Sequence, residues 1–401
     1  MTPDRDRLAR TLIELVKIRS VNPFDETTKE GFREQEMSDD LLSRFRTLGM
    51  ETGWRQVAPG RPNVWGRLKG TDDGPTIMLA AHMDTVGMEG YEAAFDAELK
   101  DGRIKGRGSC DMKAAFACYL EVVRMLREND ITLPGDLIIA GIVDEEHLLT
   151  GSAEMGKNGP SADFGIIGEP SKLAICPTHK GQLCAKIFTS GVATHSSRPE
   201  KGVNAVEHMG AVIQHLSGLN AELQERGPSH PLCGTGRFSM NVVRGGTFAS
   251  GIPDQCEMEV DRRFLPGEDI DDILDDYRAR LAELSKTIPD FQAEVIGPTL
   301  LARALDVPLT SPLVEAISGA AKATLKTDPE ITAFPGGTDA PNLGFPCVIC
   351  GPGDLAQAHS TDEYVELEEM VQATEIYLRT VLSLNGFKSA EVNGFFSQVF
   401  V

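Results

Sequence analysis

Apolar and polar positions follow two different periods along the chain, and the change of period divides it into regions. In the first ~180 residues, short apolar runs have the length of buried strands, and longer runs between them have helical spacing. Strands that alternate with helices favour a mostly parallel sheet covered by helices. The expected strands are 76–81, 137–143 and 164–168, the clearest helix is 112–127, and an amphipathic helix is expected near the start of the chain.

From about 181 to 297 the pattern changes to alternating apolar and polar residues, which is typical of half-exposed strands. Strands are expected within 181–191 and 256–268, with helices at 202–223 and 268–285. After about 303 the first pattern returns, with a helix near 311–325 and strands near 331–334 and 346–351; 389–401 could not be assigned. We therefore expect an α/β domain of residues 1–180 plus 298–401, with a smaller α+β domain of residues 181–297 inserted into it.

Composition narrows the class of protein. The chain has 39 basic and 60 acidic residues, a net charge of −21. This charge argues against nucleic acid and anionic membrane as partners, because both require a basic face. There is no apolar run of about 18 residues, and charges interrupt the N-terminal apolar positions, so neither a membrane span nor a secretory signal is expected. The eight cysteines are scattered, and the Cys347–Cys350 pair lies in an apolar run, so we expect a reduced, cytoplasmic protein.

Imidazole or carboxylate side chains stand at five places where an apolar run gives way to a loop. They are His82 with Asp84, Asp111, Glu145 with Glu146, Glu169, and His359. Each has an ordinary explanation when taken alone. The histidines could be structural, Asp111 could cap the helix that follows it, and the glutamates could face solvent. In parallel sheets, however, ligands sit just past the carboxyl ends of the strands, which is where these residues are expected.

Several carboxylates at one sheet edge would repel one another, and bound cations would relieve that cost. Imidazole together with carboxylate suits zinc or manganese. Two histidines and three carboxylates are enough for two metal ions bridged by one carboxylate. Such ions lie ~3.5–4 Å apart and can share an activated water.

Five segments resemble motifs of the M20 metallopeptidase family, in order and over nearly the whole chain: AAHMDTV, GRGSCDMKAA, VDEEHLLTGS, IIGEPS and AHSTDEYV. The resemblance implies a di-metal amidohydrolase, most readily with zinc, or with manganese or cobalt. It implies His82 and Glu169 on one metal, His359 and Glu146 on the other, and Asp111 as the bridge. Asp84 would orient the His82 ring, and Glu145 would be the general base. The residues alone leave open which of the paired glutamates binds metal.

The segment VATHSSRPEKGVNAVEHM also resembles the family, in which the smaller domain forms a homodimer. The resemblance implies that His195 stabilises the oxyanion in the partner's active site; otherwise it is a loop histidine. Asn204 and Arg263 match positions that line the pocket or hold a substrate carboxylate, with Arg262 as the rival that could simply face solvent. In the loop 335–344, Gly336, Gly337 and Thr338 could present donors to a substrate carboxylate.

The expected reaction is hydrolysis of the amide bond of a small N-acyl amino acid, as in deacetylases and desuccinylases, or of a short peptide. Three alternatives remain open. They are a dipeptidase or carboxypeptidase, a catabolic hydrolase or deaminase acting on another C–N bond, and a non-catalytic binding homologue.

Overall fold

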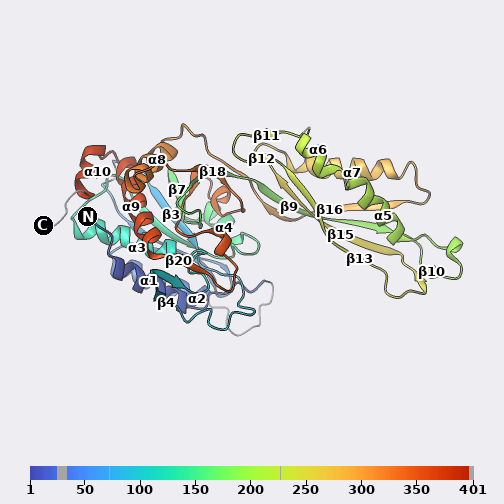
Figure 1. The fold of residues 1–401 in the computed structure, drawn as a ribbon, viewed down its shortest axis with the longest axis horizontal. Helices are drawn as coiled ribbons and strands as arrows, with labels where there is room; N and C mark the ends of the chain where they lie inside the picture. Colours follow the sequence, from blue (N-terminus) through green and yellow to red (C-terminus); the bar gives the residue numbers. More distant parts are fainter. Residues whose placement is uncertain (25–33, 72, 226, 397–401) are drawn as a thin grey trace. The chain divides into compact units, whose positions relative to one another are not determined.

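The computed structural model describes residues 1–24, 34–71, 73–225 and 227–396 (Figure 1). Its chain contacts define two compact units. The first comprises Met1–Thr178, Asp306–Phe334 and Thr338–Val401, and the second comprises His179–Leu305 and Pro335–Gly337. The expected insert, 181–297, lies within the second unit.

A nine-stranded sheet organises the first unit, in the order β1-β2-β6-β3-β7-β19-β8-β17, with β18 paired to β8. Its central strands are parallel: β6 (Leu137–Ile142), β3 (Ile77–His82), β7 (Phe164–Ile167) and β19 (Cys347–Ile349). Antiparallel strands β1 (Glu51–Ala58) and β2 (Arg61–Leu68) extend one side, and β8 (Ile175–His179), β17 (Leu305–Asp306) and β18 (Ile331–Phe334) lie on the other. Every residue of β3 and β6 is buried, as the continuous apolar runs predicted.

Helices pack on this sheet and on each other. Helix α3 (Lys113–Glu128) contacts strand β3 and the helices α1 (Arg5–Lys17) and α9 (Leu367–Leu384). Helices α2 (Glu34–Thr47) and α4 (Thr150–Asn158) contact β1 and β2. Helix α8 (Pro312–Leu325) packs on α9, as does α10 (Ser389–Phe396), which accounts for most of the segment 389–401; its last residues, 397–401, lie outside the described residues. A small sheet of β20 (Tyr364–Glu366), β5 (Arg103–Lys105) and β4 (Glu98–Lys100) completes the unit.

The second unit is built on a four-stranded antiparallel sheet, β13 (Arg237–Gly245), β15 (Gln255–Phe264), β9 (Gly181–Ser190) and β16 (Gln292–Ala302), in that order. Helices α5 (Ala205–Leu216), α6 (Leu219–Glu225) and α7 (Ile270–Leu284) pack on it, so the predicted helix 202–223 is two helices. Alternate residues of β9 and β15 enter the core between sheet and helices, for example Leu183, Ile187 and Met258. The predicted fold class, a mostly parallel α/β sheet with an α+β insert, is confirmed.

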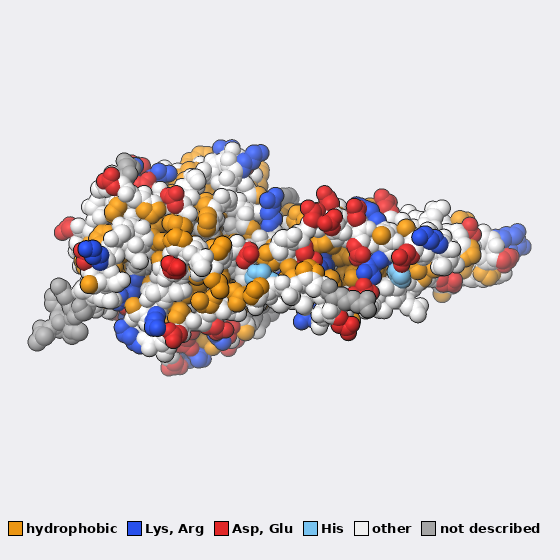
Figure 2. Space-filling model, turned by 90° about the horizontal axis from the view of Figure 1, so that it is seen from above, with side chains coloured by type: hydrophobic (Ala, Val, Ile, Leu, Met, Phe, Trp, Pro, Cys, Tyr) orange, Lys and Arg blue, Asp and Glu red, His pale blue; other side chains and the backbone are white. Residues whose placement is uncertain are grey.

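The surface carries charges of both signs. On the face shown in Figure 2, Lys and Arg side chains lie scattered among acidic ones. Within the described part of the chain, no helix combines the length and apolarity that a membrane span needs. All eight cysteines are free; Cys347 lies in β19 and Cys350 directly after it, and both are buried as expected.

Candidate metal centre

The predicted metal ligands of the first unit follow the carboxyl ends of its parallel strands. They are His82 at the end of β3, Glu146 after β6, Glu169 after β7 and His359 in the loop after β19. Neighbouring parallel strands end at the same sheet edge, so the fold brings these loops together. The fifth predicted ligand, Asp111, lies in a buried turn directly before α3.

Asp111 lies between the two histidines. Its Oδ1 is 3.0 Å from His82 Nε2, and its Oδ2 is 3.5 Å from His359 Nε2. On the His359 side, Glu146 Oε2 is 3.0 Å from the same nitrogen. On the His82 side, Glu169 Oε1 is 4.0 Å from His82 Nε2. Each imidazole therefore lies near a glutamate and shares Asp111 with the other imidazole.

The donor set fits divalent cations. Ligand atoms of His82, Asp111 and Glu146 all lie within 4.8 Å of one another. Glu146 Oε1 and Glu169 Oε1 are buried and have no hydrogen-bond partner among the described residues. A buried carboxylate oxygen without a partner is costly, and a cation would remove that cost. Nitrogen and oxygen donors in this combination suit zinc, manganese or cobalt.

The protonation of these groups reflects the crowding of charge. Burial raises the pKa of Glu145 and of Glu169 well above the ordinary value, and it raises that of Glu146. Hydrogen bonds to Asp111 and Glu146 raise the pKa of His359 to about 10. Burial also acts to raise the pKa of Asp111, but hydrogen bonds from the two imidazoles outweigh it and hold that pKa below its usual value. The carboxylates and the two imidazoles therefore titrate as one coupled group.

Glu145 lies beside this group without facing His359. Its Oε2 is 4.0 Å from His82 Nε2, and its side chain is 14% exposed. The neighbouring Glu146 contacts His359 instead. Glu145 thus lies near His82 and Glu146 contacts His359, a distinction that the residue pattern alone could not make.

Asp84 is fully buried, and its contacts differ from the expected one. The nearest partner of His82 Nδ1 is the backbone carbonyl of Asp84 at 2.9 Å, while the Asp84 carboxylate is 3.6 Å away. That carboxylate instead accepts the backbone N–H groups of Glu145 and Glu146, at 3.2 and 3.1 Å, and the Asn22 amide at 2.7 Å. Asp84 therefore holds the paired glutamates as well as the ring of His82.

A second layer of polar residues, which the sequence did not predict, supports this arrangement. The Asn22 amide also donates to Asp144 Oδ1 at 3.1 Å, and Arg61 donates to Asp144 at 2.9 Å and to Glu34. Burial, followed by the charge of Asp84, raises the pKa of Glu34 to about 8. Asp144 lies within the quoted VDEEHLLTGS motif, but Asn22, Glu34 and Arg61 come from separate parts of the chain outside the five motifs, so no local signal pointed to them.

The glycine-rich loop contributes a further buried acid, Asp339. Its Oδ1 has no hydrogen-bond partner among the described residues, and burial raises its pKa to about 7. Its charge also acts to raise the pKa of Glu145 and of Glu169. The preceding Thr338, predicted as a donor to substrate, is buried, and its hydroxyl accepts the Ala340 N–H at 3.3 Å. Gly336 and Gly337 belong to the second unit.

His195 is exposed on β10 (Thr194–His195) in the second unit, where it pairs with β14 (Gly251–Ile252). Its Nδ1 accepts the Ser197 N–H at 3.1 Å and lies 2.8 Å from the Ser197 hydroxyl. An accepting Nδ1 places the proton of the neutral ring on Nε2. His195 therefore presents its Nε2–H as a hydrogen-bond donor.

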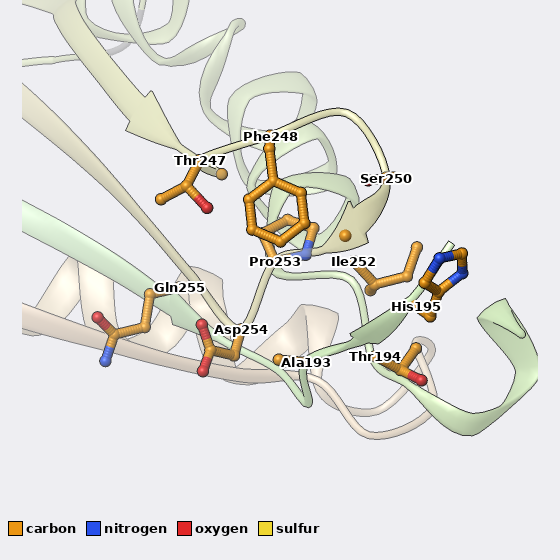
Figure 3. Close-up of a pocket in the computed structure, with 12 residues that line it drawn as sticks. Ala193, Thr194, His195, Thr247, Phe248, Ser250, Ile252, Pro253, Asp254 and Gln255 are labelled. Atoms are coloured by element: carbon orange, nitrogen blue, oxygen red, sulfur yellow. The ribbon is translucent and has the colours of Figure 1, made fainter. Parts of the chain in front are cut away.

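His195 also borders a cavity of about 510 Å³ within the second unit (Figure 3). Residues 246–255, which run from the end of β13 through β14 to the start of β15, line most of it, including Phe248, which is 67% exposed, and Ile252. The lining combines apolar side chains with the polar edge of His195.

Two other predicted substrate ligands have partners inside the second unit. Asn204 caps α5: its Oδ1 accepts the Val206 N–H at 3.0 Å, and its amide donates to Glu207. Arg263 is partly exposed, with its Nε 2.9 Å from Asp261 Oδ1.

The expectation that Arg262 could face solvent is wrong. It is only 3% exposed, and it donates to Glu268 and to the backbone carbonyl of Arg263, both at 2.6 Å. Side chains alternate along β15, so Arg262 shares the helix-covered face with Val260 and Phe264.

Comparison with known proteins supports the same family. Residues 78–383 match Peptidase family M20/M25/M40. The chain is 32% identical to N-formyl-4-amino-5-aminomethyl-2-methylpyrimidine deformylase of Bacillus subtilis (strain 168), over 86% of this chain and 88% of the relative. It is 29% identical to acetylornithine deacetylase of Vibrio campbellii (strain ATCC BAA-1116), over 92% and 96%. Its fold is similar to that of aminopeptidase PepT from Bacillus cereus ATCC 10987, with a TM-score of 0.78 at 23% identity, over 95% and 99%. The chain therefore belongs to Peptidase family M20/M25/M40 and is a metallohydrolase of that family, as its five motifs predicted.

Proposed function

We propose that this protein hydrolyses the amide bond of a small N-acyl amino acid or a related N-acyl amine, using water activated at a pair of divalent cations. The observation that carries the proposal is the position of Asp111, which turns one oxygen to each of two imidazoles. A carboxylate placed in this way is suited to bridge two ions.

We propose the division of the ligands that the family motifs imply, in which Glu169 rather than the equally distant Glu145 joins His82. His82 and Glu169 would hold one ion, His359 and Glu146 would hold the other, and Asp111 would be common to both. Zinc is the ion that this donor set suits best, with manganese or cobalt as alternatives. When bound, the ion pair would polarise the scissile carbonyl and lower the pKa of a shared water.

Glu145 would move the proton. Its carboxylate lies beside His82, and its raised pKa makes it a stronger base than an exposed glutamate. It would accept a proton from the attacking water as the C–O bond forms, and then deliver that proton to the departing nitrogen as the C–N bond breaks. Asp84 would keep Glu145 in place through the Glu145 N–H.

We further propose that the protein is a homodimer formed through the second unit, in which the Nε2–H of His195 would stabilise the oxyanion in the partner's active site. Exposed apolar side chains on this unit support the dimer. They are Val192, Val206, Val243 and Phe248, which are 53%, 41%, 50% and 67% exposed. Strand β13, which carries Val243, is an edge strand of its sheet and could pair with a second copy.

The substrate class follows from the sequence relatives. The two relatives above are a deformylase and a deacetylase, names that favour an N-acyl substrate over a peptide. Arg263 remains our proposed ligand for a substrate carboxylate, with Gly336, Gly337 and Thr338 as further donors. Asn204 would have to release Glu207 to take part. We also retain a reducing, cytoplasmic location, which agrees with the eight free cysteines.

A mass-spectrometric screen tests the proposal. N-acetyl, N-succinyl and N-formyl substrates and a dipeptide set are offered to protein stripped of metal and to protein reloaded with zinc, manganese or cobalt. We expect N-acyl substrates to turn over only in the reloaded protein. Turnover of dipeptides alone would show that the substrates are peptides and not N-acyl amines. Equal turnover by stripped protein would overturn the metal-dependent mechanism.

A further inference from the structure

A buried glutamate with no assigned role, Glu363, lies four residues after His359. It is fully buried and directly precedes β20. Its Oε1 accepts the backbone N–H groups of Cys110 and Asp111, at 3.0 and 3.1 Å. Glu363 therefore binds the backbone of Asp111, whose carboxylate the two imidazoles share, and it lies on the same loop as His359.

The other oxygen of Glu363 is bound to Arg107. Arg107 Nη1 donates to Glu363 Oε2 at 2.6 Å, and Arg107 Nε donates to the Gly87 carbonyl at 2.9 Å. The Gly106 N–H donates to the Glu363 carbonyl at 3.1 Å. The pair thus ties together the segment after β3, the turn before α3 and the loop that carries His359.

These contacts give Glu363 a different role from that of the proposed metal ligands. Glu146 and Glu169 each keep a buried oxygen with no hydrogen-bond partner in the described part of the chain, whereas both oxygens of Glu363 accept hydrogen bonds. Burial, together with the nearby charge of Asp111, raises the pKa of Glu363, and Arg107 and the two N–H groups oppose that shift. A buried carboxylate is retained at such a position only when its hydrogen bonds offset desolvation, and here they fix the Asp111 backbone.

We infer that Glu363 is a positioning residue of the metal centre, which sets Asp111 and the His359 loop at the separation that cation binding needs. The inference rests on the proposed function, because it takes Asp111 and His359 as ligands. It assigns Glu363 no contact with cation or substrate. Partners that orient ligands in this way typically contribute about 10- to 100-fold to metal affinity.

Two variants test this role. Glu363→Gln keeps an oxygen for the two N–H groups but turns an amide N–H against Arg107. Glu363→Asp keeps the charge but draws the carboxylate away from the Cys110 and Asp111 N–H groups. Glu121→Gln is the matched control, because Glu121 on α3 is also fully buried, accepts the Asp4 N–H at 3.1 Å and pairs with Arg7 at 2.6 Å.

The measurements are the zinc dissociation constant by chelator competition, the zinc stoichiometry, and the unfolding temperature of the cation-free protein. We expect all three variants to unfold at lower temperature. We expect zinc to bind about 10- to 100-fold more weakly to both Glu363 variants, and within threefold of the natural protein in Glu121→Gln.

Zinc affinity unchanged in a folded Glu363 variant would overturn the inference and leave the proposed function standing. If one Glu363 variant does not fold, the other decides. Failure of both to fold, while Glu121→Gln folds and binds zinc, would assign Glu363 to folding and also overturn the inference. A natural protein that binds no divalent cation would instead overturn the proposed function.

Discussion

At the scale of single residues, the site depends on carboxylates that bind the backbone N–H groups of the functional residues. Asp111 reaches both imidazoles because its own N–H is bound by Glu363, and the paired glutamates are held by their N–H groups on Asp84. Each of these carboxylates acts on a functional side chain through the main chain, which moves less than a side chain does. Charge-assisted bonds of this kind are stronger than neutral ones.

Glu145→Gln separates catalysis from metal binding. The amide cannot take a proton from water, so we expect turnover to fall by about 10²- to 10⁴-fold. Metal content by mass spectrometry of the native protein should not change, because Glu145 is not among the proposed ligands. Glu154→Gln, at a partly exposed residue of α4, serves as control and should keep full activity. Full activity in Glu145→Gln would end the assignment of Glu145 as the base.

Asp84→Asn tests the second role found for Asp84. Only one oxygen of the amide remains for the Glu145 and Glu146 N–H groups, and its NH₂ group opposes them. We expect zinc affinity to fall by about 10- to 100-fold and turnover to fall with it. Chelator competition and initial rates measure the two effects. A loss confined to turnover would mean that Asp84 does not hold the ligand Glu146.

At the scale of elements, the central strands were predictable and the edge strands were not. Strands β3 and β6 are buried throughout, so their sequences are continuous apolar runs. Strands β13 and β16 are edge strands, in which exposed positions break the alternation, and both were missed. Burial alone does not decide the outcome, because β8 is buried throughout and was not predicted either, whereas the more exposed β18 was.

The same division applies to the site. His82 and Glu169 were predictable because each stands at the end of a recognisable apolar run within a family motif. Glu363 and Asn22 were not, because their contacts join segments separated by 252 and 62 residues. No local pattern records such pairs, although Glu363 lies inside the quoted AHSTDEYV motif.

His179, the last residue of β8, gives the fold a pH dependence. Burial lowers its pKa to about 4, whereas a histidine of the unfolded chain titrates near pH 6.5. Between these values the unfolded chain binds more protons, so stability is lost as the pH falls from about 6.5 to 4. This contribution is on the order of 3 kcal/mol at the acid end.

His179→Asn should therefore flatten the pH profile of stability. Denaturant unfolding of the cation-free protein from pH 7 to 4.5 measures it, with the exposed His195→Asn as control. We expect the natural protein and the control to lose stability in parallel, and His179→Asn to lose less. Three parallel profiles would show that His179 does not remain neutral in the folded state.

At the scale of the whole molecule, the proposed dimer links the two active sites through His195. Val243→Asp would place a charge on the edge strand β13, and we expect the dimer to dissociate at least tenfold more readily, a change of about 1.4 kcal/mol. Leu309→Asp in the first unit is the matched control, because Leu309 is 52% exposed and Val243 is 50% exposed. Sedimentation velocity compares the two, and equal dissociation in both variants would place the dimer contact elsewhere.

The central claim is that two imidazoles and three carboxylates from distant parts of the chain hold a pair of cations. Anomalous diffraction at the zinc edge, from crystals of zinc-loaded protein, tests it most directly. We predict two peaks ~3.5–4 Å apart, with Asp111 between them, His82 and Glu169 on one, and His359 and Glu146 on the other. The absence of zinc from this cluster, or its coordination by a different set of residues, would contradict the account.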